Sequence, residues 1–138
     1  MKKTFALLLV LGFVSCNKNK DKQASDPVTD DPNKVLYSQV MDIHDEVMPR
    51  MDDIMKLKRE LKETVESASN LVPEKKKELE RKIIQLDSAS KAMMQWMNDF
   101  RPEEYTGEEL REYLESEKER VTKVKELMLE AIQKAKEN

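Results

Sequence analysis

The chain has 138 residues, of which 38% are charged and 5% aromatic, and it contains only two glycines. This length supports one domain, and so little glycine beside so much Glu, Lys, Leu and Met excludes a protein built mainly of β-sheet. The formal net charge is −3, and discounting Lys2 and Lys3 leaves 23 bases against 28 acids, a charge of −5, which argues against nucleic acid or anionic lipid as the main partner.

The first 15 residues are predicted to be a lipoprotein signal peptide. Lys2-Lys3 gives a positive start, an apolar run follows over 5–14, and a serine then precedes Cys16. The apolar run is too short to span a bilayer, which takes roughly 20 residues. A cysteine in this place predicts lipidation of Cys16 and attachment to a membrane through the lipid. The alternative is a free thiol after ordinary signal cleavage.

A polar tether is predicted to join the lipidated cysteine to a single helical domain. Residues 17–30 are polar, carry one sizeable apolar side chain and show no periodicity, so we assign 16–31 to a disordered tether. The domain then covers 32–138. It opens with Asp31-Pro32, which is typical of an N-cap followed by proline at the first helical position.

Three helices are predicted in this domain, over about 32–69, 73–100 and 107–136. Apolar residues recur in steps of three and four through each range. The positions predicted to face inward include Val40, Val47 and Ile54 in the first helix, Leu86 and Met93 in the second, and Leu114, Val121 and Met128 in the third.

Two local sequence signals add detail to the predicted first and third helices. Pro49 lies inside the first one, where it removes a backbone donor and crowds the preceding turn, so we expect a kink or local unwinding near 45–49. Thr106 and Glu109 have the spacing of a capping box, which predicts a side-chain cap at the start of the third helix.

Short connections between the helices predict an all-α fold, an antiparallel three-helix bundle with coiled-coil-like packing. Folding the chain at its two turns pairs apolar residues in one register. This register places His44 level with Met97, Met97 level with Leu110, and Leu86 level with Val121. One half of the bundle is then mainly aliphatic and the other is rich in methionine.

Side chains around the single histidine form a candidate site for Cu(I). Met48 follows His44 by one turn, and the predicted register brings Met93 and Met97 close. Imidazole and thioether ligands suit Cu(I), and the indole of Trp96 could cover the ion by a cation–π contact. The alternative is a methionine-packed core with His44 at its margin, bonded to a neighbouring carboxylate.

The same register makes a prediction about the surroundings of His44. Its side chain should be at least half buried and lie beside Met97 or Trp96. Asp45 and Glu46, which follow it in the sequence, are expected to project to other faces of the helix.

A docking surface for another protein is the third possibility for the methionine-rich half. Trp96, Met51 and Met94 are the candidate contact residues, since methionine-rich surfaces adapt to varied partners. Trp96 lies off the heptad positions and is expected to be only partly buried, as binding anchors often are. The alternative is a tryptophan that seals the bundle.

Catalysis finds no support in the sequence. It contains no Gly-rich phosphate loop and no Ser/His/Asp set that can be placed, and one histidine would have to do all general-base work. We therefore expect a protein that is not an enzyme and has no cofactor, with Cu(I) as the exception considered above.

The segments HDEVMPRM (His44–Met51) and MMQWMNDF (Met93–Phe100) resemble a group of small lipoproteins from Bacteroidetes that are often labelled "viral A-type inclusion protein". The resemblance covers the whole chain and implies a lipoprotein, with no particular activity. In such bacteria an acidic run after the lipidated cysteine acts as a surface-export signal. Residues 17–21 read NKNKD instead, which predicts an outer-membrane lipoprotein that faces the periplasm. Its expected role is to bind an unknown envelope protein or to help organise the envelope.

Overall fold

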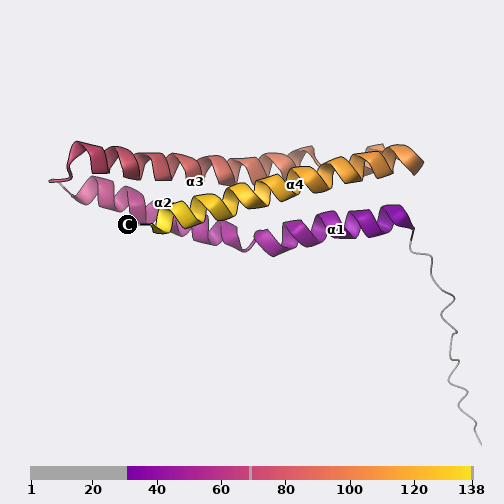
Figure 1. The fold of residues 1–138 in the computed structure, drawn as a ribbon, viewed down its shortest axis with the longest axis horizontal. Helices are drawn as coiled ribbons and strands as arrows, with labels where there is room; N and C mark the ends of the chain where they lie inside the picture. Colours follow the sequence, from indigo (N-terminus) through magenta and orange to yellow (C-terminus); the bar gives the residue numbers. More distant parts are fainter. Residues whose placement is uncertain (1–30, 69, 138) are drawn as a thin grey trace, which may run out of the picture.

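The computed structural model describes residues 31–68 and 70–137, whose helices pack side by side (Figure 1). Their bounds are α1 Pro32–Val47, α2 Arg50–Ser67, α3 Pro73–Asp99, the short 3-10 helix η1 Pro102–Glu104, and α4 Gly107–Lys136. Neither stretch contains a β-strand, so the fold is all-α. The predicted signal peptide, Cys16 and the tether as far as residue 30 lie outside the described residues.

Aspartate and proline open the helices as the sequence predicts. The carboxylate of Asp31 accepts a hydrogen bond from the backbone N–H of Asn33 at 3.0 Å. Pro32 occupies the first turn of α1, where a missing N–H costs nothing. Pro73 opens α3 in the same way, directly after an extended Val72. The starts of both helices are therefore encoded locally.

The first predicted helix is interrupted at Met48 and Pro49, which divides it into α1 and α2. Pro49 has no N–H to donate to the carbonyl of Asp45. The N–H of Met48 still donates to the carbonyl of His44 at 2.9 Å, but the N–H of Met51 bonds the Met48 carbonyl, three residues back, at 3.0 Å. The predicted local unwinding is confirmed.

The start of α4 differs from the prediction. Thr106 is the N-cap residue, but its side chain makes no capping hydrogen bond, so the capping box with Glu109 is wrong. Gly107 has a φ of 58°, a left-handed conformation that glycine adopts without steric cost. The chain enters the helix through this conformation. The first turn is closed by a backbone hydrogen bond alone, which the N–H of Leu110 donates to the carbonyl of Thr106 at 3.3 Å.

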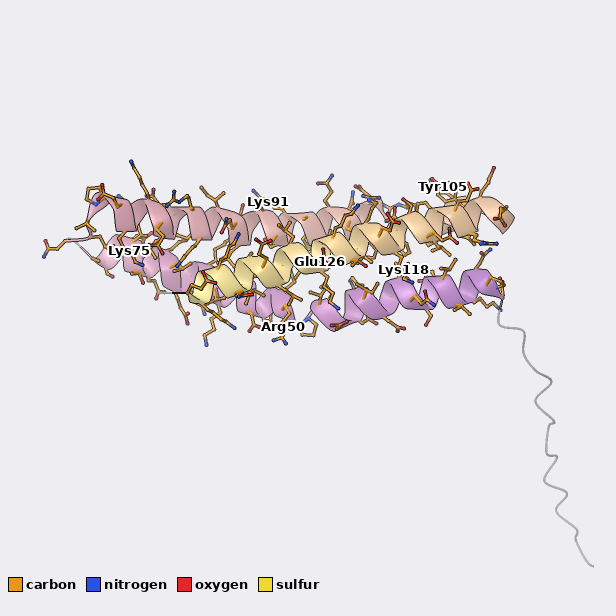
Figure 2. All side chains as sticks on the ribbon, in the orientation of Figure 1. Arg50, Lys75, Lys91, Tyr105, Lys118 and Glu126 are labelled. Carbon is orange, nitrogen blue, oxygen red and sulfur yellow. The ribbon has the colours of Figure 1, made fainter. Side chains whose placement is uncertain are left out.

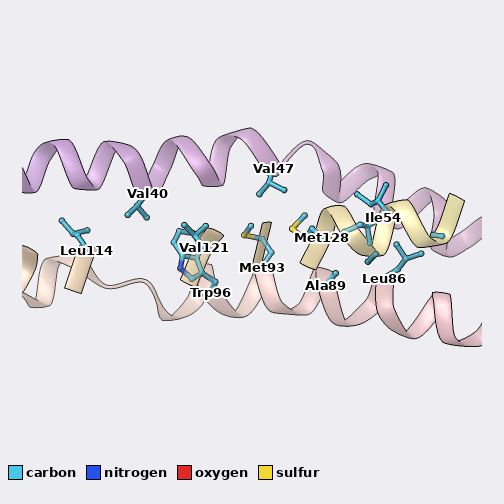
Figure 3. Packing of buried hydrophobic residues seen from close by; sticks show 13 residues of the cluster. Val40, Val47, Ile54, Leu86, Ala89, Met93, Trp96, Leu114, Val121 and Met128 are labelled. Atoms are coloured by element: carbon cyan, nitrogen blue, oxygen red, sulfur yellow. The ribbon is translucent and has the colours of Figure 1, made fainter. Parts of the chain in front are cut away.

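One hydrophobic cluster runs between the helices (Figure 3). Its largest fully buried side chains come from all four α-helices: Val40, Val47, Ile54, Leu86, Met93, Leu114, Val121 and Met128. Burying a side chain of this size stabilises the fold by about 1.5–3 kcal/mol before the entropy cost of ordering it. Each of these residues occupies a position that the helical period predicts to face inward.

Side-chain contacts of α3 with α1 and α2 show the direction in which these helices run relative to one another. His44 of α1 contacts Met97 of α3, and Lys58 of α2 donates to Asp87 of α3 at 2.5 Å. Residue numbers therefore rise along one helix as they fall along the other. The predicted pairing of His44 with Met97 is confirmed.

Contacts between α1 and α4 show the opposite relation between the directions of two helices. Lys118 donates to the amide oxygen of Gln39 at 2.7 Å, and Lys125 donates to the carboxylate of Glu46 at 2.6 Å. Residue numbers rise together along these two helices, so α4 lies beside α1 and runs the same way (Figure 1).

The register between α3 and α4 is displaced from the predicted one. The prediction puts Met97 level with Leu110, whereas the indole N–H of Trp96 donates to Oε2 of Glu117 at 2.8 Å. Glu117 lies more than one helical turn further along α4 than the predicted partner.

The connection between α3 and α4 explains this displacement. The segment from residue 100 to residue 106 includes η1 and does not reverse tightly, so α4 begins beside the start of α1. The side-chain amide of Asn33 donates to the carbonyl of Gly107 at 2.9 Å and holds it there. The hydroxyl of Tyr113 accepts from the backbone N–H of Arg101 at 2.7 Å and ties the connection to α4.

Charged side chains cover the outside of the helices along their length (Figure 2). Several pair within one helix, as Lys91 does with Asp87 at 2.7 Å and Lys75 with Glu78 at 3.0 Å. Exposed pairs of this kind contribute about 0–1 kcal/mol each, so they add solubility more than stability. Among the described residues, no helix is both long and apolar enough to cross a membrane.

Candidate functional site

The candidate site centres on His44, in the last turn of α1, just before the Pro49 interruption. The side chain of His44 is 15% exposed, and its Nε2 lies 3.2 Å from Sδ of Met97 on α3. The prediction that His44 is at least half buried and lies beside Met97 is therefore confirmed. The break at Pro49 follows within two turns of His44.

The other ring nitrogen of His44 contacts a carboxylate. Nδ1 lies 2.8 Å from Oδ1 of Asp45, whose side chain is 72% exposed. The expectation that Asp45 projects to another face is wrong, and the alternative in which His44 bonds a neighbouring carboxylate is confirmed. Its short side chain reaches across the helix surface with one oxygen and leaves the rest of the carboxylate in solvent.

Aromatic rings extend the site away from His44. The ring of Trp96 lies 5.7 Å from that of His44, between centroids, and stacks on Phe100 at 5.0 Å. Phe100 in turn lies 6.0 Å from Tyr37 of α1 and 6.0 Å from Tyr113 of α4. This row of rings joins α1, α3 and α4 on one side of the histidine.

Trp96 belongs to the core and not to the surface. It is 3% exposed, and its indole N–H donates to the carboxylate of Glu117, which also accepts from Arg120 at 2.6 Å. Of the two interpretations of Trp96, the partly buried binding anchor is wrong and the buried tryptophan of the alternative is confirmed. The sequence places Glu117 at a heptad position, but nothing in it identifies Trp96 as the partner, because that pairing depends on the α3–α4 register.

The other predicted site residues divide between core and surface. Met93 is fully buried, and Met48 and Met51 are partly buried against the same hydrophobic cluster. Met94 is 55% exposed and is therefore available to a partner. Of the four predicted metal ligands, His44 and Met97 are in direct contact, while Met48 and Met93 lie one turn away along their helices.

Tyr113 is a residue of this region that sequence reasoning misses. Burial raises the pKa of its hydroxyl above the usual value; the hydrogen bond from Arg101 opposes this shift, and the charge of Glu117 adds to it. The ring stacks on Tyr105 with centroids 4.3 Å apart. Tyr113 directly precedes the heptad position of Leu114, so a strict core pattern overlooks it.

The chemistry available at the site is that of a soft-ligand pair beside an aromatic wall. Imidazole nitrogen and thioether sulfur are donors that Cu(I) prefers, whereas oxygen-rich sets suit harder ions. Within 31–68 and 70–137, no group of three or more His, Cys, Asp or Glu side chains is arranged to hold a metal ion. Comparison with protein-family models, with curated proteins and with solved structures finds no match to this chain.

Proposed function

We propose that the chain is a lipid-anchored protein of the bacterial envelope whose helical domain is a non-enzymatic module. The module binds another envelope protein or helps to organise the envelope. The observation that carries the proposal is the positive start, the apolar run and the small residue directly before Cys16. The resemblance to small Bacteroidetes lipoproteins supports the same location, at the periplasmic face of the outer membrane.

For the domain itself we propose an antiparallel three-helix bundle with coiled-coil-like packing, in which α1 and α2 together act as the first member. Support comes from the contacts that join His44 to Met97 and Lys58 to Asp87, since they run in opposite directions along the two members. The buried positions also recur at the three- and four-residue steps of a heptad.

Polar side chains inside the bundle are used to join helices, which supports a structural or binding role. Lys82 of α3 is 8% exposed and donates to the carbonyl of Glu137, just after α4, at 2.5 Å. Glu117 of α4 likewise accepts from Trp96 of α3. In the described stretches every buried side-chain nitrogen or oxygen has a hydrogen-bond partner.

Cell fractionation of a Cys16→Ala variant tests the anchor. The native protein should remain in the outer-membrane fraction after a high-salt wash, and the variant should be unprocessed or soluble. Ser15→Ala is the matched control, because it keeps a small residue before the cysteine and should leave the protein anchored. A Cys16→Ala protein that stays in the washed outer membrane would refute the anchor. Protease added to intact cells should leave the native protein uncut if it faces the periplasm.

Capture of a partner from detergent-solubilised membranes tests the module. Met94 offers an exposed apolar side chain on α3, so Met94→Asp should weaken capture of a specific envelope protein. Gln95→Asp adds the same charge at the next exposed position and serves as the control. Equal loss in both variants, or in neither, would argue against a contact through Met94.

A further inference from the structure

We propose that His44 and Met97 form a binding site for one Cu(I) ion at the contact between α1 and α3. The site is independent of the anchor and the protein-binding role proposed above. The proposal starts from the distance of 3.2 Å between Nε2 of His44 and Sδ of Met97. The two atoms come from different helices, and no covalent bond holds them together.

The hydrogen-bonding requirements of His44 favour a cation at this contact. A neutral imidazole has one N–H and one lone pair, whereas a carboxylate and a thioether sulfur can only accept. The carboxylate of Asp45 faces Nδ1, and the sulfur of Met97 faces Nε2. When the proton lies on Nδ1 and is donated to Asp45, two lone pairs face each other across the contact. A second proton on Nε2, donated to the sulfur, or a metal ion between the two atoms satisfies both.

The separation of the two donors shows how far the contact must open to take an ion. Metal bonds of about 2.0 Å to imidazole nitrogen and about 2.3 Å to sulfur, as found for zinc, span the observed gap at an angle of roughly 95°. A Cu(I) ion held by these two ligands alone is close to linear, which puts the two donors about 4.3 Å apart, the sum of the two bonds. The 3.2 Å between Nε2 and Sδ must therefore open by about 1 Å when the ion binds. Rotation of the flexible Met97 side chain provides that opening without movement of the backbone.

The surroundings match the needs of a soft monovalent ion. Asp45 holds the Nδ1–H of His44 and so presents the Nε2 lone pair, which is the usual role of a carboxylate behind a ligating histidine. The ring of Trp96 lies 5.7 Å from the imidazole, between centroids, so a cation bound at His44 lies near its π-system. The thioether selects a soft ion over zinc or magnesium. Asp45 and Trp96 therefore act as positioning and shielding residues, while His44 and Met97 are the ligands.

Anaerobic titration of the full-length protein in detergent with Cu(I), held by a chromophoric chelator as competitor, tests the site. The native protein should take one Cu(I) from the chelator with a Kd of about micromolar or tighter. Trp96 is the only tryptophan in the chain, so its fluorescence should be quenched in step with binding. The measurement is repeated on Cys16→Ala, which should bind equally, so that a contribution from a free thiol is detected.

Variants separate ligands from packing. Met97→Leu keeps nearly the same volume and should abolish both binding and quenching, as should His44→Gln. Met94→Leu changes an exposed methionine on the same helix and should bind like the native protein. Asp45→Asn should retain the site with Cu(I) affinity lowered about 10- to 100-fold. Circular dichroism checks that each variant is folded.

Several results would overturn the proposal. They are failure of the native protein to take Cu(I) from the chelator, binding that persists in Met97→Leu, and binding that disappears in Cys16→Ala. Equally tight binding of Zn(II) would also overturn it, because a thioether ligand should disfavour that ion. Because anchoring is scored by fractionation and this site by titration, failure of either proposal leaves the other standing.

Discussion

At the scale of single residues, Asp87 joins two helices by charge. Its carboxylate accepts from Lys58 of α2 and from Lys91 of its own helix. The hydrogen bond from Lys58 is the main cause that lowers the pKa of Asp87 from 3.8 to about 2, with Lys91 second. A depressed pKa means that the folded state holds the proton less tightly than the unfolded state. The stabilisation is therefore present above pH 3.8 and is lost as the pH falls towards 2.

Asp87→Asn tests this linkage. The variant should have a lower free energy of unfolding than the native protein at pH 6, and the difference should shrink as the pH falls through the window from about 4 to about 2. Urea unfolding at a series of pH values measures it. Glu63→Gln, an exposed substitution on α2, is the control. A difference between native and Asp87→Asn that stays constant with pH would contradict the ion-pair explanation.

A second residue-scale prediction concerns the buried hydrogen bond between Trp96 and Glu117. Glu117 is 2% exposed and Trp96 is 3% exposed, so neither group can turn to water when its partner is removed. Glu117→Leu should lower the free energy of unfolding by about 1–3 kcal/mol, because it leaves a buried indole N–H without an acceptor. The same change should cost less in a Trp96→Phe background, where that donor is absent.

A double-mutant cycle followed by circular dichroism measures the coupling between the two positions. We expect a coupling free energy of about 0.5–3 kcal/mol, as for residues in direct contact. An equal cost of Glu117→Leu in both backgrounds would mean that Arg120, the other partner of Glu117, carries the stabilisation.

At the scale of elements, the interruption between α1 and α2 is the main irregularity. Replacing Pro49 by Ala restores a backbone donor for Asp45 and favours a continuous helix, by up to about 3 kcal/mol in an isolated helix. We expect a much smaller gain, or a loss, in the free energy of unfolding. The reason is that Met48 and Met51 already pack against the hydrophobic cluster in the interrupted geometry.

Chemical denaturation of Pro49→Ala measures this balance, and Cu(I) titration of the same variant shows whether the interruption positions His44. The control is Met55→Ala, a more than half exposed position in the next turn of α2, which should leave both quantities nearly unchanged. A gain close to the full helix-propensity value would mean that the packing around Met48 does not depend on the break.

At the scale of the whole molecule, the helices share one hydrophobic cluster, and the heptad pattern predicts which side chains it contains. The pattern does not decide how far α4 slides along α3. A slide by one heptad brings apolar positions opposite apolar positions again, so alternative registers bury similar area. Leu114 and Val121 are therefore buried as predicted, but against different neighbours.

Part of the candidate site also follows from the sequence, and part of it depends on the tertiary structure. The pairing of His44 with Met97 follows from the sequence, because the connection between Ser67 and Pro73 is short and permits little choice of register. The burial of Trp96 does not follow from it, since that depends on the longer connection before α4. A bond from His44 to a neighbouring carboxylate is one of the alternatives that the sequence offers, but a side-chain rotation, and not helix geometry, decides that Asp45 supplies it.

The sequence by itself determined the helical class, the start of α1, the break at Pro49 and the inward-facing residues. These properties depend on backbone donors, on dihedral preferences and on a period of three to four residues, which act within a few turns of chain. Only the tertiary structure decided the α3–α4 register and the burial of the Trp96–Glu117 pair. Both depend on the path of the connection around η1 and on polar contacts such as that of Asn33 with Gly107, which join residues far apart in the chain.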